Sequence, residues 1–208
     1  MNVHAIILAA GTSSRMGKPK QLLDLYGKPV LEHVIDAVLD ADFTSVTAVI
    51  GNEAEKIKSS IKKSDPRFRW VVNDTFDQGQ STSVRKGIES IGEETVNAML
   101  FLGDMPLIKK ETIHRLLQTG IDTMRAPSAS SCVIRPSFQR KPGHPVFFVR
   151  VSRTLFQSIH GDKGAKPIMK YIDAKKLIVV DDIGIHFDLD TIEDYERAIE
   201  IFAQHEEP

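Results

Sequence analysis

Apolar runs alternate with amphipathic segments along the first half of this 208-residue chain. Residues 5–9 form a continuous apolar run that ends before a small-residue turn, which is typical of a buried strand. Between residues 28 and 41, apolar side chains recur at steps of one and four, which places them on one face of a helix. The same patterns predict strands at residues 45–50, 69–72 and 97–102, and helices at residues 53–61 and 81–91.

Strands that alternate with helices indicate an α/β fold with right-handed crossovers and a largely parallel sheet. We find no internal repeat, low-complexity tract or dividing linker, so a single domain is expected over residues 1–208. Ligands of such sheets bind at the carboxyl ends of the strands. The loops that follow Leu8, Val72 and Leu102 are therefore the places to look for chemistry.

The second half of the chain is less regular. Its patterns predict strands at residues 131–134, 146–149, 177–180 and 185–189, and a helix at residues 165–171. A last helix is expected from residue 191 to about residue 203. Thr191 and Asp194 have the spacing of a capping box at its start.

Composition narrows the class of protein. Lys and Arg number 27 against 28 Asp and Glu, and this net charge of -1 does not resemble the basic surface of a nucleic-acid binder. The one cysteine, Cys132, excludes an intrachain disulfide and suits a reducing cytoplasm. The first apolar run is too short for a signal peptide or a membrane span. We expect a cytoplasmic protein that binds neither nucleic acid nor membrane.

The loop after the first strand has the chemistry of a phosphate site. It reads LAAGTSSRMGKPKQLL, in which small residues let a ligand approach the main chain and the N–H groups after Gly11 form an anion-binding nest. Arg15 and Lys20 add a planar fork and a movable point charge. The spacing fits neither a P-loop nor a dinucleotide fingerprint. A solvated turn explains the small residues but not the two cations.

Carboxylates occur in two other places. Asp104, in GDMP, ends a buried strand, where a charge is costly unless a cation or metal pairs with it. In FDLDTIEDY, Asp188 and Asp190 share a face if the segment is a strand, which indicates a metal between them. Magnesium prefers one or two carboxylates with phosphate oxygens and waters. The alternatives are a helix cap at Asp104, and a cap at Asp190 with Asp188 solvated.

Three further loops carry weaker signals. NDTFDQGQSTS, residues 73–83, offers amides and hydroxyls that can read a base edge. RKPGHP, residues 140–145, and GDKGAK, residues 161–166, are basic and rich in glycine, as suits an acidic second substrate or an ordinary surface turn. His144 has two open interpretations, a substrate contact or a structural histidine.

The chain resembles the MobA-like nucleotidyltransferases, in particular their molybdenum cofactor cytidylyltransferase branch, which includes proteins of purine catabolism. The resemblance rests on five motifs: LAAGTSSRMGKPKQLL, GDMP, GHPVFF, GDKGAK and DLDTIEDY. The resemblance implies a Rossmann-like three-layer α/β/α domain, mostly parallel with a small antiparallel part. It implies Mg²⁺ held by Asp104 with Asp188 or Asp190, and catalysis by Arg15, Lys20 and Asp104. The implied nucleotide-binding residues are Leu8, Ala9, Ala10, Gly11, Thr12, Arg15, Lys20, Asn73, Gly79, Ser81 and Gly103, and the implied acceptor-binding residues are His144, Gly161, Asp162 and Lys166.

By the same resemblance, the reaction transfers CMP from CTP to the terminal phosphate of molybdopterin cofactor and releases pyrophosphate. A transient contact with a xanthine-dehydrogenase-type molybdoenzyme is also implied. Ala10 stands where the guanylyl branch usually has glycine, whereas Ile192 and Lys166 replace residues that are frequent in the family. Three other hypotheses stay open: a cytidylyl- or guanylyltransferase for a sugar, polyol or lactyl phosphate, a non-catalytic cofactor carrier, and a nucleotide-binding regulator.

Overall fold

The computed structural model describes residues 2–12, 19–127 and 130–205. In this part of the chain, an eight-stranded sheet has the order β10-β7-β9-β6-β1-β4-β5, with β8 paired to β7. The strands are β1 (His4–Ala9), β4 (Ser45–Ile50), β5 (Phe68–Val72), β6 (Thr95–Leu102), β7 (Cys132–Phe138), β8 (Lys141–Pro142), β9 (Val146–Ser152) and β10 (Ala174–Val179). A separate small hairpin joins β2 (Asp24–Leu25) to β3 (Lys28–Pro29).

Strand directions confirm the expected mixed sheet. β1 lies between β4 and β6 and is parallel to both, and β5 continues the parallel order beyond β4. β9 runs antiparallel to β6 and to β7, while β10 is parallel to β7. The chain passes from β1 to β4 and β5 on one side and then returns to β6 on the other side of β1. The loops after β1 and β6 therefore flank a crevice of the kind that binds ligands in α/β sheets.

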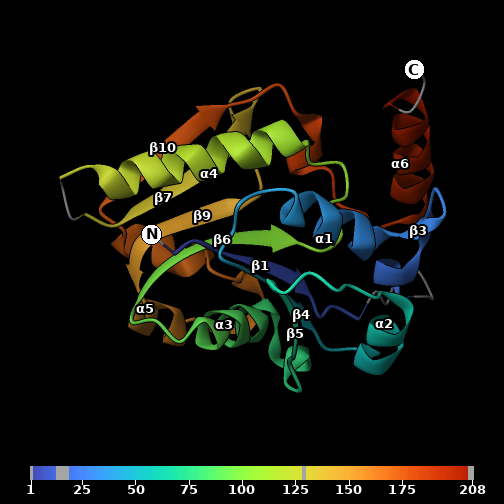
Figure 1. Cartoon of the computed structure of the whole chain (residues 1–208), viewed down its shortest axis with the longest axis horizontal. Coiled ribbons are helices and arrows are strands. Elements are labelled where there is room, and N and C mark those ends of the chain that lie inside the picture. The colour runs from blue at the N-terminus through green and yellow to red at the C-terminus, as the bar shows by residue number, and fades with distance from the viewer. Residues whose placement is uncertain (1, 13–18, 128–129, 206–208) are drawn as a thin grey trace.

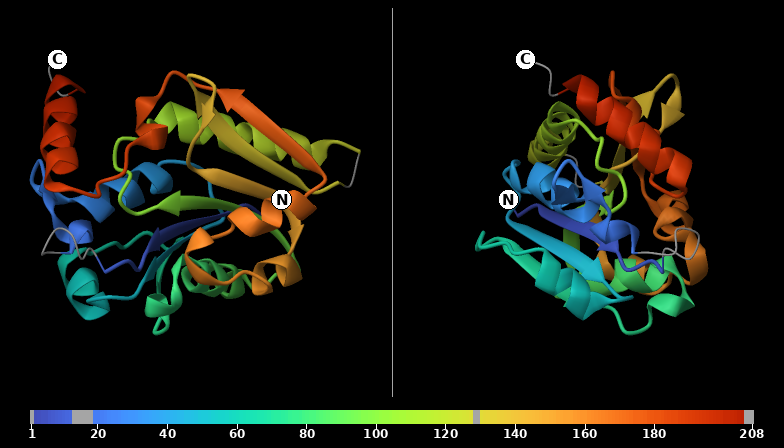
Figure 2. Two further views of the ribbon diagram at one scale, coloured as in Figure 1. Left: turned by 180° about the vertical axis from the view of Figure 1, so that it is seen from behind. Right: turned by 90° about the vertical axis from the view of Figure 1, so that its right-hand side faces the viewer.

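Helices cover both faces of the sheet, which gives the three-layer single domain that was expected (Figures 1 and 2). The helices are α1 (Val30–Leu39), α2 (Ala54–Ser60), α3 (Gln80–Ile91), α4 (Lys110–Arg125), α5 (Arg153–Gln157) and α6 (Ile192–His205). Alternate residues of β1 point to opposite layers, so that Ile7 packs in one core cluster with Leu31 and Leu116, and Ile6 packs in the other with Val84.

Two predicted elements differ from the structure. Residues 185–189 do not form a strand; a 3₁₀ helix, η5 (Ile183–His186), is followed by extended chain. The alternation of buried and exposed residues there is real, but the backbone bonds to loops, as when Leu189 N–H donates to Asp104 O at 3.0 Å. The helix expected at residues 165–171 is the 3₁₀ helix η4 (Lys166–Tyr171).

The capping box at the last helix is confirmed. Asp194 N–H donates to Thr191 Oγ1 at 3.1 Å, and Thr191 N–H donates to an Asp194 carboxylate oxygen at 2.9 Å. Helix α6 stands at one end of the molecule (Figure 2), where Ala198 packs with Leu189 and Leu25 in a third core cluster. Thr191, and not Asp190, therefore caps the helix.

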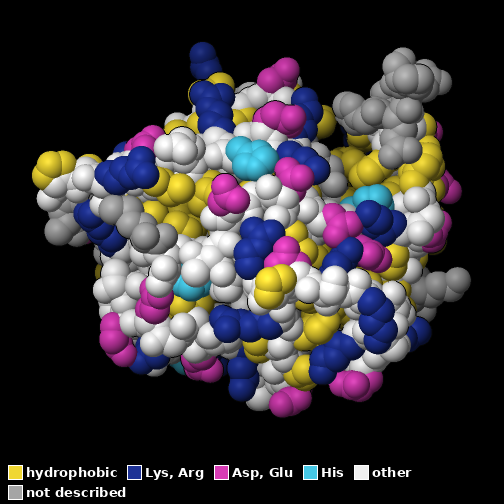
Figure 3. All heavy atoms as spheres, in the orientation of Figure 1, with side chains coloured by type: hydrophobic (Ala, Val, Ile, Leu, Met, Phe, Trp, Pro, Cys, Tyr) yellow, Lys and Arg dark blue, Asp and Glu magenta, His cyan; other side chains and the backbone are white. Residues whose placement is uncertain are grey.

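The outer surface is mixed in charge. Lys and Arg side chains lie beside Asp and Glu over the face seen in Figure 3, in keeping with the net charge of -1. Across the described ranges, no helix combines the length and the apolar character that crossing a bilayer requires.

Candidate active site

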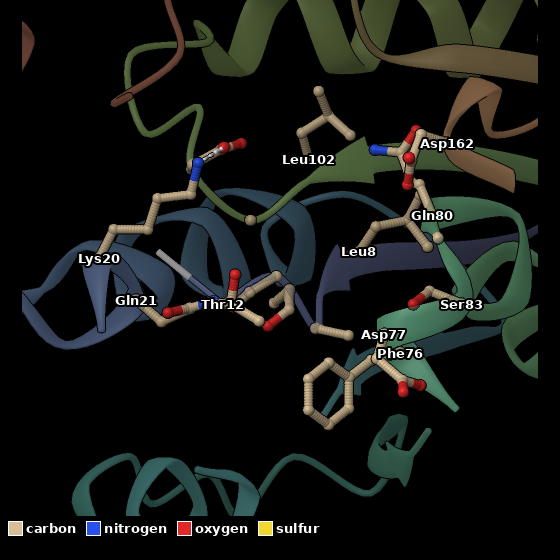
Figure 4. A pocket seen from close by; sticks show the side chains of 16 residues that line it. Leu8, Thr12, Lys20, Gln21, Phe76, Asp77, Gln80, Ser83, Leu102 and Asp162 are labelled. Atoms are coloured by element: carbon tan, nitrogen blue, oxygen red, sulfur yellow. Dashed lines mark hydrogen bonds and ion pairs between the residues drawn. The ribbon is translucent and has the colours of Figure 1, made fainter. Parts of the chain in front are cut away.

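A cavity of about 340 Å³ lies at the carboxyl ends of β1 and β6 (Figure 4). Figure 4 shows Lys20 extended across one end of the cavity, with Gln80 and Asp162 near the other. The lining residues are Leu8, Ala9, Ala10, Gly11, Thr12, Lys20, Gln21, Phe76, Asp77, Gly79, Gln80, Ser83, Leu102, Gly103, Asp104 and Asp162. Residues from all three loops singled out in the sequence therefore meet around one space.

The turn after β1 is held from both sides. The buried Gln21 amide donates to Ala9 O at 2.9 Å and to Gly11 O at 3.1 Å. Gly103 N–H donates to Leu8 O at 2.8 Å, and a side chain at Gly103 would collide with the Ala9 Cβ. Sequence reasoning missed the role of Gln21, although it stands within the first motif. Arg15, which was expected to contact phosphate, lies outside the described residues.

Lys20 joins two of the predicted carboxylates. Its ammonium group donates a short hydrogen bond to Asp104 and a second bond, of 2.9 Å, to Asp190 Oδ1. Burial opposes the charged form of this lysine, but the attraction of Asp104 and the bonds to both carboxylates outweigh it and raise the pKa of Lys20. Lys20 is therefore a cation at neutral pH in a partly buried, acidic setting.

Asp188 lies close to this group without an ion pair to Lys20 within the described residues. Burial, followed by the negative charges of Asp190 and Asp104, raises the pKa of the Asp188 carboxyl above its ordinary value. The strand expected here does not form, but Asp188 and Asp190 still alternate with the buried Phe187 and Leu189. The loop still brings all three acidic groups into one electrostatic neighbourhood.

These carboxylates fit a divalent cation that shares its coordination with a ligand. Among the described residues, no group of three His, Cys, Asp or Glu side chains is arranged to hold a metal alone. Magnesium takes one or two protein carboxylates and completes its shell with phosphate oxygens and water. Asp104 and Asp190, already drawn to one positive group, match that requirement. Asp104 does not cap the next helix, the alternative considered for it, because Asp182 accepts the N–H of Lys109 at the start of α4.

Two residues expected to bind nucleotide do not line the cavity. Asn73 is fully buried, and its amide bonds to Thr82 and Ser83. Ser81 is also fully buried, and its hydroxyl donates to Gly164 O at 3.2 Å. Both side chains stabilise the loop instead. From the same segment, Asp77, Gln80 and Ser83 line the cavity in their place.

A second cavity, of about 280 Å³, shares Leu8, Gln80 and Leu102 with the first. Its wall carries four groups that are basic or can become so: Arg135, His144, Lys163 and Lys166. Arg135 was missed in the sequence. The signal for it is a charged residue within an otherwise apolar strand, and the strand pairing of β7 decides which way it faces.

Arg135 is fixed to the loop that carries His144. Its Nε donates to Gly143 O at 3.1 Å, and Nη2 donates to Pro142 O at 3.3 Å. Burial, and then the charge of Arg135, lower the pKa of His144 to about 4, so its ring is neutral at neutral pH. Within the described residues, His144 Nδ1 is buried and has no hydrogen-bond partner.

The GDKGAK loop serves both cavities. Of the two residues of this loop expected to bind the acceptor with charged side chains, Lys166 lines the second cavity and Asp162 lines the first. Gly161 lines neither and instead packs against Gly79, where an added Cβ would come within 2.5 Å of the Gly161 carbonyl carbon. This close approach explains why glycine stands at position 79.

A mostly parallel α/β sheet with a turn of small residues, a cation and carboxylates around one cavity is typical of nucleotide-binding enzymes. The comparisons with known proteins narrow the class to the nucleotidyltransferases. Residues 5–177 match the model of the MobA-like NTP transferase domain. The chain belongs to this family.

Three relatives illustrate the likeness. The protein Rv0371c from Mycobacterium tuberculosis H37Rv has a solved structure that is 26% identical, with a TM-score of 0.75 over 96% of this chain and 98% of that one. Molybdopterin-guanine dinucleotide biosynthesis protein A from Archaeoglobus fulgidus shares the fold, at 17% identity, a TM-score of 0.72, and coverage of 97% and 99%. The bifunctional protein GlmU of Chromohalobacter salexigens is 34% identical over 119 residues, which are 56% of this chain and 25% of that protein. The chain thus spans about a quarter of the length of the curated relatives it matches.

Proposed function

We propose that this nucleotidyltransferase transfers CMP from CTP to the terminal phosphate of molybdopterin cofactor and releases pyrophosphate. The observation that carries the proposal is the meeting of Lys20, Asp104 and Asp190 at a cavity that adjoins a second, basic one. The first cavity takes the nucleotide, and the second takes an anionic acceptor. A cytoplasmic location and a transient contact with a molybdoenzyme of the xanthine dehydrogenase type complete the proposal.

The chemistry follows from this placement. An oxygen of the acceptor phosphate attacks the α-phosphorus of the nucleotide, and the bond from that phosphorus to the bridging oxygen of pyrophosphate breaks. Phosphate is already ionised near pH 7, so the step needs no strong general base. Lys20 stabilises the charge that develops on the transferring group and on pyrophosphate. Arg15 is proposed to act with it.

The proposed ligands of magnesium are Asp104 and Asp190, with Asp188 beside them. When bound, the ion neutralises the triphosphate and orients its oxygens. Rv0371c supports a divalent metal, because a solved structure of that protein, 25% identical with a TM-score of 0.71, is a complex with manganese. The raised pKa of Asp188 fits the same view, since a cation beside it would relieve the repulsion from Asp190 and Asp104.

The nucleotide is proposed to lie along the turn after β1, where the small residues leave the main chain accessible. Leu8, Ala9, Ala10, Gly11, Thr12, Gly79 and Gly103 all line this cavity. Gln80 and Ser83 have the amide and hydroxyl needed to read a base or a ribose. The preference for CTP rests on Ala10, which matches the cytidylyl pattern of the family rather than the guanylyl one.

The acceptor is proposed to bind in the second cavity. Arg135, Lys163 and Lys166 supply positive charge, and the neutral His144 supplies a ring that can hydrogen-bond without adding charge. A planar guanidinium held by two backbone carbonyls suits a phosphate oxygen better than a freely moving lysine does. Archaeoglobus molybdopterin-guanine dinucleotide biosynthesis protein A, which shares the fold, makes a molybdopterin acceptor a reasonable choice.

A panel of nucleoside triphosphates against phosphorylated acceptors tests the proposal, with released pyrophosphate as the measured product. We expect turnover with CTP, molybdopterin cofactor and Mg²⁺, and none without the metal. Turnover only with a sugar, polyol or lactyl phosphate would show that the proposed acceptor is wrong and that the proposed reaction, nucleotidyl transfer, is right. Cofactor binding without pyrophosphate release from any combination would contradict the enzyme and favour a carrier.

A further inference from the structure

Residues 181–190, here called the strap, lie between β10 and α6 and form hydrogen bonds with residues that line both cavities. The strap carries Asp188 and Asp190, and its Leu189 N–H donates to Asp104 O at 3.0 Å. Farther back, Ile185 O accepts a hydrogen bond of 3.0 Å from His144 N–H in the wall of the second cavity. The position of the strap therefore sets where the acidic groups stand.

Asp182 anchors the beginning of the strap. Its side chain is 1% exposed, which is unusual for a carboxylate. Oδ2 accepts the Lys109 N–H at 2.9 Å and the Thr112 hydroxyl at 2.6 Å, while Oδ1 accepts the Gly184 N–H at 2.9 Å. One carboxylate thus ties the strap to the first turn of α4, where the helix dipole also favours a negative charge.

The contact between the two segments leaves no room for a side chain at Gly184. A Cβ at Gly184 would overlap the Leu107 carbonyl, so the strap packs directly on the backbone that follows Asp104. Leu107 and Lys109 belong to the short connection between Asp104 and α4. Fixing that connection to the strap fixes Asp104 relative to Asp190, although the two are far apart in the chain.

We propose that Asp182 is a positioning residue: its buried carboxylate locks the strap to the connection after Asp104 and thereby holds the two metal-binding carboxylates at the spacing a divalent cation needs. This inference rests on the proposed function. Without the lock, the bond from Leu189 N–H to Asp104 O and the packing of Gly184 on Leu107 still join the two segments, but the start of the strap loses its anchor on α4. The mutual repulsion of Asp104 and Asp190 then separates them more easily when Lys20 turns to phosphate. Residues that orient metal ligands in this way affect metal affinity about 10–100-fold.

The test is the affinity for Mn²⁺, measured by electron paramagnetic resonance with CTP present and acceptor absent, so that no turnover occurs. Asp182→Asn keeps the shape but gives one oxygen in place of two, and should weaken Mn²⁺ binding about tenfold or more. Thr112→Val removes one bond to Asp182 and should weaken it less, whereas Thr112→Ser retains the hydroxyl and should bind as wild type does. Thermal unfolding confirms that each variant is folded.

Asp173→Asn is the matched control. Asp173 also accepts a backbone N–H and a hydroxyl, both from Ser131, but at the opposite end of β10. It should leave Mn²⁺ affinity unchanged. Wild-type affinity in folded Asp182→Asn overturns the inference; should that variant not fold, wild-type affinity in Thr112→Val overturns it equally. Asp104→Asn distinguishes a failure of this inference from a failure of the proposed function. If this variant too binds Mn²⁺ with wild-type affinity, the proposed metal site itself is wrong.

Discussion

The ammonium nitrogen of Lys20 lies 2.9 Å from Asp190 Oδ1, although 170 positions of sequence separate the two residues. The same nitrogen bonds to Asp104, 84 positions away. Three segments that are remote in the chain thus meet at one charged group that lines the first cavity.

Replacing Lys20 with methionine should lower pyrophosphate release about 10²–10³-fold, which corresponds to about 3–4 kcal/mol in the barrier. The variant keeps most of the side chain's length but loses the charge that stabilises the transferring phosphate. Lys28→Met is a suitable control, because Lys28 pairs with Asp36 at 2.7 Å and lies outside the cavity. Wild-type pyrophosphate release from folded Lys20→Met would refute the assignment.

Replacing Arg135 with alanine should raise the KM for the acceptor about tenfold or more and leave the KM for CTP nearly unchanged. The reason is that Arg135 lines the second cavity but not the first. Steady-state kinetics with each substrate varied in turn measure both constants. Arg69→Ala makes a comparable change on β5, where the guanidinium donates to Thr47 and Ser90. If both KM values rise together in Arg135→Ala, the two cavities do not bind separate substrates.

Replacing Gly79 with alanine should destabilise the protein by about 1–3 kcal/mol in chemical denaturation. Its φ of 105° lies in a region that glycine alone occupies readily, and the new Cβ would meet the Gly161 carbonyl carbon at 2.5 Å. Gly92→Ala isolates the backbone contribution, because Gly92 has a φ of 78° and nothing within 4 Å of the added carbon. Equal losses in the two variants would show that the contact with Gly161 contributes nothing.

His144 should make stability depend on pH. Its pKa in the folded protein is about 4, below the ordinary 6.5 that the unfolded chain retains, so the unfolded chain binds the proton first as pH falls. The contribution of neutral His144 to the free energy of unfolding is fully present above pH 6.5 and is lost as pH falls toward 4. Between pH 7 and pH 5 the loss should be about 2 kcal/mol.

Urea unfolding of wild type and His144→Gln at both pH values measures this contribution. The comparison removes the effect of the carboxyl groups and the other histidines, which titrate in both proteins. We expect the free energy of unfolding to fall less in the variant by about 2 kcal/mol. An identical fall in the two proteins would mean that His144 titrates alike in the folded and unfolded states.

Local pattern was sufficient for most of the architecture. The apolar run of β4 predicted Ser45–Ile50 with its bounds correct, and the capping box at Thr191 and Asp194 formed as expected. Such features depend on neighbours in sequence and on the period of a strand or helix, so one segment contains the information. The strand–helix alternation likewise predicted that the loops after β1 and β6 would meet at one edge.

Tertiary structure decided which side chains face the cavity. Asn73 and Gln80 both carry amide side chains within residues 73–83, but Asn73 is buried and bonds to Thr82 and Ser83, whereas Gln80, at the start of α3, lines the first cavity. The alternation at residues 185–189 was real, but no neighbouring strand took up its hydrogen bonds. These outcomes depend on which remote segment offers a partner within bonding distance, and that information belongs to the folded chain as a whole rather than to any single segment.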